Sequence, residues 1–306
     1  MNSKKTLFVS FIFLFLFSGV AYGDFQTSFK AGRQAFSQKQ FDLALKNYQE
    51  AKNQTEIPGQ RYQALLAISD VYQARGDWAN AEKVLEQILK DESIAVQNRM
   101  FARNRLGDCK LKQKKVEAAV AEYQKVESSG VQNNESEYAQ LACGNLLLQL
   151  KKYEDAQKYF QLLLANQKAS SARRTQAQIG MGNIMFASGK YEDAIAALKE
   201  IAWNPKEKEV VRAAALTVIA RAQFRLKAYK DICQTDFAII ALNNIPSYYK
   251  AAAYMQVISI LEGAMKDYTQ AKKLLDEFEK MPGLNASQAK WIETYRAKIK
   301  KAEYTI

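Results

Sequence analysis

Histidine is absent from the 306-residue sequence. Its absence excludes Ser-His-Asp and Cys-His nucleophilic sites, the His-containing zinc deaminase centre and every metal site with histidine ligands. Proline and glycine are scarce, with 4 and 13 residues, which disfavours an all-β chain with many turns and favours helices. Most classes of enzyme are thereby excluded, and we expect a non-catalytic protein without a cofactor or metal.

Cysteine is also rare, and its three residues cannot form a complete disulfide framework because their number is odd. We expect Cys109, Cys143 and Cys233 to be small buried residues. A bridge between Cys109 and Cys143 in an oxidising compartment is the alternative.

Long hydrophobic runs are limited to the N-terminus. Two lysines precede the uncharged, mostly apolar stretch Leu7–Val20, and small residues follow it. This pattern predicts a secretory signal peptide over residues 1–23, cleaved after Gly23. The alternative is an uncleaved anchor, although 14 helical residues reach only about 21 Å against a hydrocarbon core of roughly 30 Å. No cysteine marks a lipid attachment site, so we expect export to a bacterial periplasm, with an extracellular location as the alternative.

A motif in which an aromatic or apolar residue precedes an alanine by three positions recurs every 37 to 39 residues. The pairs are Phe41/Ala44, Trp78/Ala81, Val116/Ala119, Tyr153/Ala156, Tyr191/Ala194, the weaker Tyr229/Ile232, and Tyr268/Ala271. Twelve residues before the second member of each pair lies a small residue: Gly32, Ser69, Gly107, Gly144, Gly182, Ala220 or Ser259. Four residues after it lies a large side chain in six units, and Asp236 is the exception.

These spacings predict packed pairs of antiparallel helices. Apolar positions within each half recur at three, four and seven residues, which places them on one helical face. The small residue and the alanine allow the two backbones to approach closely. Residues 24–283 then form an array of units near 25–58, 59–96, 97–133, 134–171, 172–208, 209–246 and 247–283. Residues 284–306 form a capping helix with Trp291, Ile292, Tyr295 and Ile299 on its inner side.

The stretches from Gly182 to Ala194 and from Gly144 to Ala156 carry the fullest form of this pattern, ending in Gly-Lys-Tyr-Glu-Asp-Ala and Tyr-Glu-Asp-Ala. At these residues the chain resembles the tetratricopeptide repeat (TPR) family, over roughly residues 25–283. The resemblance implies an all-α fold, a right-handed α-solenoid of about seven TPR-like helix hairpins with a C-terminal capping helix. The units exceed the usual 34 residues. They are similar to the longer units of bacterial cell-envelope TPR proteins.

The resemblance also implies a concave groove, lined by the residue that follows each small position. These residues are Arg33, Asp70, Asp108, Asn145, Asn183, Arg221 and Ile260. Asn145 and Asn183 could hold a peptide backbone through their amides. Phe186 and Phe224 could anchor apolar side chains of a partner. The alternatives are a solvated polar stripe and core aromatics. The positions of the carboxylate clamp found in some TPR proteins do not match, so that clamp is not expected.

The basic surplus, a formal net charge of +12, has one dense cluster. It consists of Arg99, Arg103, Arg105, Lys110, Lys112, Lys114 and Lys115. Such a cluster either keeps a helix face soluble or attracts an anionic polymer of the cell envelope. Nucleic acid is a poor candidate for an exported chain.

We therefore expect an exported scaffold or adaptor. It would bind a partner protein or peptide in its groove and help to assemble or position a cell-envelope complex. The alternative function is binding of cell-wall polymer or lipopolysaccharide through basic helix faces.

Overall fold

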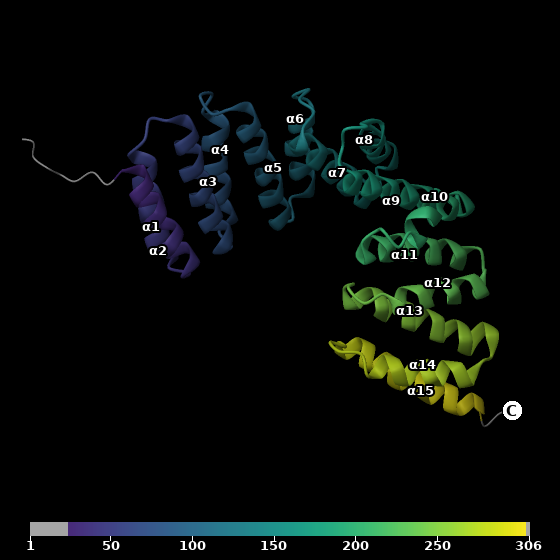
Figure 1. The fold of residues 1–306 in the computed structure, drawn as a ribbon. Coiled ribbons are helices and arrows are strands. Elements are labelled where there is room, and N and C mark those ends of the chain that lie inside the picture. The colour runs from purple at the N-terminus through teal and green to yellow at the C-terminus, as the bar shows by residue number, and fades with distance from the viewer. Residues whose placement is uncertain (1–23, 304–306) are drawn as a thin grey trace, which may run out of the picture. The chain divides into compact units, whose positions relative to one another are not determined.

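The computed structural model describes residues 24–303, which form an all-α chain of helix pairs joined by short turns (Figure 1). No strand occurs in this part of the chain. The elements are α1 (Phe25–Ser37), α2 (Phe41–Asn53), α3 (Pro58–Ala74), α4 (Trp78–Lys90), α5 (Val96–Lys112), α6 (Val116–Glu127), α7 (Asn134–Gln149), α8 (Tyr153–Ala165), α9 (Ser171–Ala187), α10 (Tyr191–Trp203), α11 (Glu209–Arg225), α12 (Tyr229–Ala241), α13 (Ser247–Ile260), the π-helical turn η1 (Leu261–Met265), α14 (Tyr268–Glu279) and α15 (Ala286–Glu303).

The predicted all-α array of helix hairpins with a C-terminal helix is thus confirmed. The expected signal peptide and its cleavage point lie outside the described residues. Among the helices that the structure describes, none is long and apolar enough to cross a membrane.

All seven hairpin turns of the described chain contain one residue in the left-handed conformation, and six of them close with the same pair of hydrogen bonds. In the fifth pair, the backbone N–H of Gly189 donates to the carbonyl of Phe186 (3.1 Å) and that of Lys190 donates to the carbonyl of Met185 (2.9 Å). Gly189 has a φ of 78°, a left-handed conformation that costs glycine little. Gly76 has the same role, and lysine takes the position in the other five turns: Lys39, Lys114, Lys151, Lys227 and Lys266. The second helix begins immediately afterwards, at the aromatic or apolar residue of the repeat motif.

Small residues on the first helices make room for the large residues of the second helices. A β-carbon at Gly144 would lie 2.5 Å from the ring of Phe160, and one at Gly182 would lie 2.6 Å from Leu198. Gly180 of the next repeat meets the same Phe160 ring from another helix. The large residue, four positions after the buried alanine, is therefore the side chain that the small position accommodates.

The seventh hairpin carries one extra residue in its first helix. There the N–H of Asp267 bonds to the carbonyl of Leu261, six residues earlier, whereas the other hairpins span five. The additional residue is absorbed by η1, because a π-helical turn holds one more residue than an α-helical turn. The first helix is consequently shifted by one position. Ser259 takes the place expected for Ile260, which is only 4% exposed.

The described chain divides into two compact units, which we call unit 1 (up to Cys109) and unit 2 (from Lys110 onward). In unit 1 the core residues include Tyr48, Leu65, Leu85 and Ile88. In unit 2 the core continues from Leu198 and Leu216 to Ile258 and Phe278. Ile292 and Ile299 of α15 complete this second core, as expected for a capping helix. All three cysteines are buried and none of them forms a disulfide, so the alternative of a Cys109–Cys143 bridge is not found.

Candidate functional site

Four first helices of unit 2 carry most of the predicted groove residues. Helix α9 contacts both α7 and α11, and α13 follows through α12. We call the surface formed by α7, α9, α11 and α13 the first-helix face of unit 2. The structure brings Asn145 and Asn183 together there, in a hollow of about 310 Å³ that also includes Ala214 and Tyr249.

The two asparagines differ in their availability. Asn145 is exposed. Asn183 is half-buried; its side-chain nitrogen donates to the carbonyl of Ile179 (3.1 Å), and its side-chain oxygen accepts from Arg221 at 3.4 Å. Its amide therefore has contacts within the protein on both sides. A peptide bound at Asn183 would have to share or replace them, whereas Asn145 can bind directly.

Arg221 and Phe186 form a stacked pair on the same face. The guanidinium carbon of Arg221 lies 4.2 Å from the centre of the Phe186 ring, a cation–π arrangement. Phe186 also packs against Tyr191, with 5.5 Å between ring centres. Phe186 is therefore half-buried and covered by its neighbours, and Arg221 is the group that faces solvent.

Phe224 occupies the position equivalent to Phe186 one repeat later, but nothing comparable covers it. Its side chain is 52% exposed and borders a hollow of about 490 Å³, together with Tyr229, Gln256 and Ser259. The Ser259 hydroxyl bonds to the carbonyl of Met255 (2.7 Å) and to the hydroxyl of Tyr295 (2.9 Å), and this short side chain has no ring-stacking group like that of Arg221. Of the two predicted anchor phenylalanines, Phe224 is the accessible one.

Unit 1 has a hollow of about 470 Å³ on α1 and α3, bordered by Arg33, Phe36 and Asp70. Arg33 is exposed, whereas Asp70 forms an ion pair with Arg105 of α5. Arg105 also donates to Gln73 at 3.0 Å. Burial raises the pKa of the Asp70 carboxyl, and the neighbouring Arg105 opposes that rise.

The ion pair joins a predicted groove residue to a predicted patch residue, so sequence reasoning had placed two partners of one contact in separate sites. The remaining patch residues differ in exposure. Arg99, Arg103 and Lys110 are half-buried, and Lys112, Lys114 and Lys115 are exposed. Asp108 is half-buried on α5.

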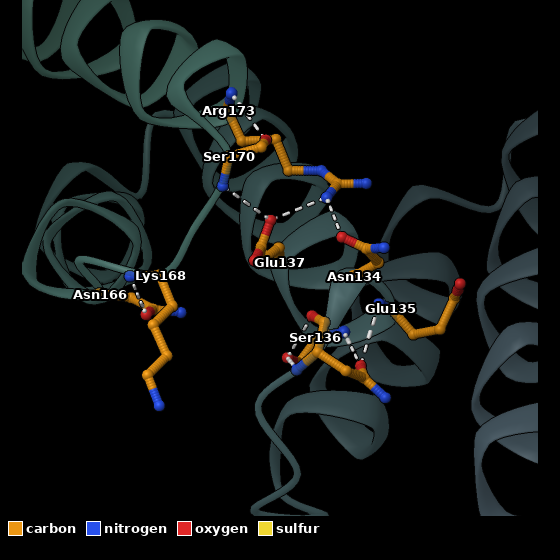
Figure 2. Close-up of polar contacts among 9 residues, drawn as sticks. Asn134, Glu135, Ser136, Glu137, Asn166, Lys168, Ser170 and Arg173 are labelled. Atoms are coloured by element: carbon orange, nitrogen blue, oxygen red, sulfur yellow. Dashed lines mark hydrogen bonds and ion pairs between the residues drawn. The ribbon is translucent and has the colours of Figure 1, made fainter.

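A polar network fixes the N-terminal ends of α7 and α9 relative to each other. Figure 2 shows Arg173 of α9 reaching Glu137 of α7, with 2.8 Å between guanidinium and carboxylate. The backbone N–H of Ser170 donates to the same carboxylate at 3.3 Å, and Asn134 accepts a weaker bond from Arg173. Glu137 is buried, so these partners stabilise its charge. The network positions the two helices that carry Asn145 and Asn183.

Asp236 is a second buried carboxylate, on α12. Burial raises its pKa to about 8, and one of its carboxylate oxygens has no hydrogen-bond partner. The repeat pattern had indicated this residue as the exception among the large apolar positions. Glu137, in contrast, had no signal in the sequence, because its role depends on Arg173, which lies 36 residues later.

No group of residues suited to holding a metal ion occurs in residues 24–303.

Comparisons with known proteins agree with this architecture. A tetratricopeptide repeat family model matches residues 66–132 and 141–208. No curated protein matches the chain.

Solved structures extend the similarity to most of the chain. A tetratricopeptide repeat protein from Parabacteroides merdae is 14% identical, with a TM-score of 0.60 over 89% of this chain and 98% of its own. The apo form of RapI is 15% identical, with a TM-score of 0.62 over 91% of this chain and 80% of its own. A Rap protein complexed with competence and sporulation factor is 14% identical, with a TM-score of 0.52 over 90% of this chain and 80% of its own. At these identities the similarity concerns the fold alone.

Proposed function

Because the chain is a tetratricopeptide repeat protein, we propose that it is a non-catalytic scaffold that binds a partner protein or peptide on its first-helix face. The observation that carries this proposal is the accessibility of that face in unit 2. It presents two hollows, of about 310 and 490 Å³, bordered by exposed polar and aromatic side chains. Repeat proteins suit this role because neighbour contacts provide stability and leave an extended surface free for binding.

A protein of the same fold offers a precedent for binding. The Rap protein cited above is in complex with competence and sporulation factor. A scaffold role also agrees with the composition, since the absence of histidine removes the commonest catalytic base.

We further propose that the protein is exported and acts in assembling or positioning a cell-envelope complex. This proposal rests on residues 1–23, which have the charge, length and small-residue pattern of a secretory signal. N-terminal sequencing of the protein purified from its native cell tests it. A mature chain that begins at Asp24 supports export, and an intact Met1 in a cytoplasmic fraction contradicts it.

Binding of an anionic polymer is a second candidate function, favoured by the exposed Lys112, Lys114 and Lys115. Salt separates the two functions. Polymer binding depends on exposed charges and should weaken steeply between about 50 and 500 mM salt, because the Debye length shortens. A partner held mainly by apolar side chains in the hollows should lose much less affinity over the same range.

The test of the proposed function is the double variant Asn145→Ala/Asn183→Ala. We expect crosslinking in the native cell, followed by mass spectrometry, to capture less partner with this variant than with the wild type. The free energy of unfolding should fall by no more than about 1–2 kcal/mol, because Asn145 is exposed and Asn183 loses only its hydrogen bonds with Ile179 and Arg221. Gln161→Ala is the matched control, since Gln161 is an exposed amide on the second helix α8. Equal capture by all three proteins would contradict the assignment of the binding face.

A further inference from the structure

We propose that helix α11 binds an extended acidic segment of the partner, with Arg221 taking a carboxylate and a hollow on either side taking an apolar side chain. The inference rests on the proposed function and specifies the chemistry of the partner. It concerns a row of residues that we call the α11 stripe: Val210, Ala214, Thr217, Arg221 and Phe224.

The α11 stripe is one continuous face of the helix. Its members are separated by four, three, four and three residues, the spacing that places side chains above one another. Val210, Arg221 and Phe224 are exposed, and Ala214 and Thr217 are half-buried. The stripe thus presents two apolar ends with an arginine between them.

Each end of the stripe borders a hollow. Val210 and Ala214 border the hollow of about 310 Å³, where Tyr249 of α13 lies on the other side. Phe224 borders the hollow of about 490 Å³. Both volumes fall within the range of roughly 300–1,000 Å³ that is typical of ligand pockets. Phe224 in particular exposes an apolar ring that a partner side chain could bury.

Arg221 is held in an outward position without a carboxylate partner. It stacks on Phe186 and reaches only the amide oxygen of Asn183, and no ion pair joins it to an acid in the described part of the chain. Its guanidinium therefore keeps most of its donors for a ligand. The stack on Phe186 already orders the Arg221 side chain. Binding a carboxylate therefore costs less conformational entropy than it would for an arginine that rotates freely.

The surrounding helices favour a negatively charged ligand. Across α9, α11 and α13 the one acidic residue is Glu209, and it accepts hydrogen bonds from the backbone of Asn243 and Asn244. Arg225 lies one residue beyond the stripe and bonds only to the hydroxyl of Tyr191. A positive surface with few acids attracts an acidic segment and disfavours a basic one.

The length of the stripe sets the spacing of the ligand's anchors. Ala214 and Phe224 are ten residues apart on α11, which corresponds to about 15 Å. An extended chain covers roughly 3.3 Å per residue, so its two apolar residues would lie four or five positions apart. The acidic residues between them would pass over Arg221.

The test uses the full-length protein and a labelled hexapeptide with phenylalanine at both ends and four glutamates between them. The same peptide with glutamines, and the same peptide with lysines, serve as charge controls. We expect the acidic peptide to bind at least about tenfold more tightly than either control, measured by fluorescence anisotropy.

Three variants locate the binding. Arg221→Met keeps an apolar stem over Phe186 but removes the charge, and should weaken binding about tenfold or more, as loss of a charge-assisted hydrogen bond does. Phe224→Ala should weaken it about fivefold or more, as loss of an interface anchor does. Lys199→Met removes the same charge from an exposed position on α10 and should have little effect.

Failure of the acidic peptide to bind at millimolar concentration, or equal effects of Arg221→Met and Lys199→Met, would overturn the inference. Photocrosslinking from position 224 in the native cell distinguishes this failure from failure of the proposed function. A captured partner together with no binding of the acidic peptide would leave the scaffold function in place and remove only the acidic ligand. Absence of both would remove both.

Discussion

Two residues at the same repeat position, one in each unit, are in opposite states. In unit 1 this position holds Asp70, and Arg105, 35 residues later, neutralises it. In unit 2 the position holds Arg221, and the residue 35 positions later is the uncharged Gln256. A charge on a first helix thus becomes part of the structure when the next repeat supplies its counter-ion. It is offered to a ligand when the next repeat does not.

The cores of the units differ at a second position. Four residues after the repeat alanine, unit 1 has Tyr48 and Leu85, both buried and apolar in their packing. Unit 2 has Phe160 and Leu198 at that position in two of its hairpins, but Asp236 in a third. Unit 2 therefore contains both an aromatic ring packed against two glycines, Gly144 and Gly180, and a buried carboxyl group without full hydrogen bonding. The three predictions below act on these differences.

The largest effect is expected from filling the space at Gly144. Gly144→Val would place a β-carbon 2.5 Å from the ring of Phe160, and overpacking a close contact of this kind costs about 1–3 kcal/mol or more. Hydrogen exchange measured by mass spectrometry should show lost protection in residues 134–208, while residues 25–95 keep theirs.

Gly263→Ala is the control for this prediction, because a β-carbon at Gly263 meets nothing within 4 Å. Its unfolding temperature should stay close to that of the wild type. If Gly144→Val and Gly263→Ala behave alike, Phe160 does not pack on Gly144 as the structure describes. If Gly144→Val instead lost hydrogen-exchange protection in both units, the prediction that unit 1 keeps its protection would be wrong.

The second prediction concerns Asp236 and pH. Its pKa is raised to about 8 in the folded protein, against 3.8 for an ordinary aspartate. The folded state therefore retains a proton that the unfolded state has lost between these values, and this contribution to stability decreases as pH rises from about 4 to about 8. Asp236→Asn should remove the pH dependence that arises from this group.

The measurement compares urea unfolding of the wild type and of Asp236→Asn at pH 5 and pH 8.5. At pH 8.5 the variant should be more stable relative to the wild type than at pH 5, by a few kcal/mol, because each unit between pH 5 and the raised pKa of about 8 corresponds to about 1.4 kcal/mol. A parallel pH response in the two proteins would show that Asp236 is not a buried titrating group. Unit 1 has no counterpart of this residue at Tyr48 or Leu85, so its hydrogen exchange should not follow the same pH trend.

The repeat pattern predicted the helix pairs because packing within each pair depends on residues close in sequence. The spacing from Gly182 to Ala194 is visible without coordinates, and the close contact of Gly182 with Leu198 follows from it. The extra residue of the seventh pair was not predicted. Counting back from Ala271 gives a regular spacing to Ser259, and the π-helical turn lies between them.

The sequence predicted which helices carry the candidate groove residues, but not which of those residues have a partner in a neighbouring repeat. The polar residue after each small position does lie on the first helices, yet its state depends on a contact with another repeat. Asp70 with Arg105 and Arg221 with Phe186 join residues 35 positions apart. No local spacing distinguishes a side chain that is neutralised in this way from one that remains open to a ligand.

The smallest expected effect is the difference in the free energy of unfolding between variants of Arg105 and Arg221. Arg105→Met leaves the half-buried Asp70 without its cation, and Arg221→Met removes a charge that has no carboxylate partner. Partly exposed ion pairs contribute about 1 kcal/mol or less, so Arg105→Met should lower the free energy of unfolding by about that amount. Arg221→Met should change it less, because the methionine side chain still covers Phe186.

The double variant Asp70→Asn/Arg105→Met provides the control, since removing both charges leaves no unpaired group. It should recover part of the stability that Arg105→Met loses in urea unfolding. Equal losses in Arg105→Met and Arg221→Met would mean that the two charges are in the same state, and the contrast between the units would disappear.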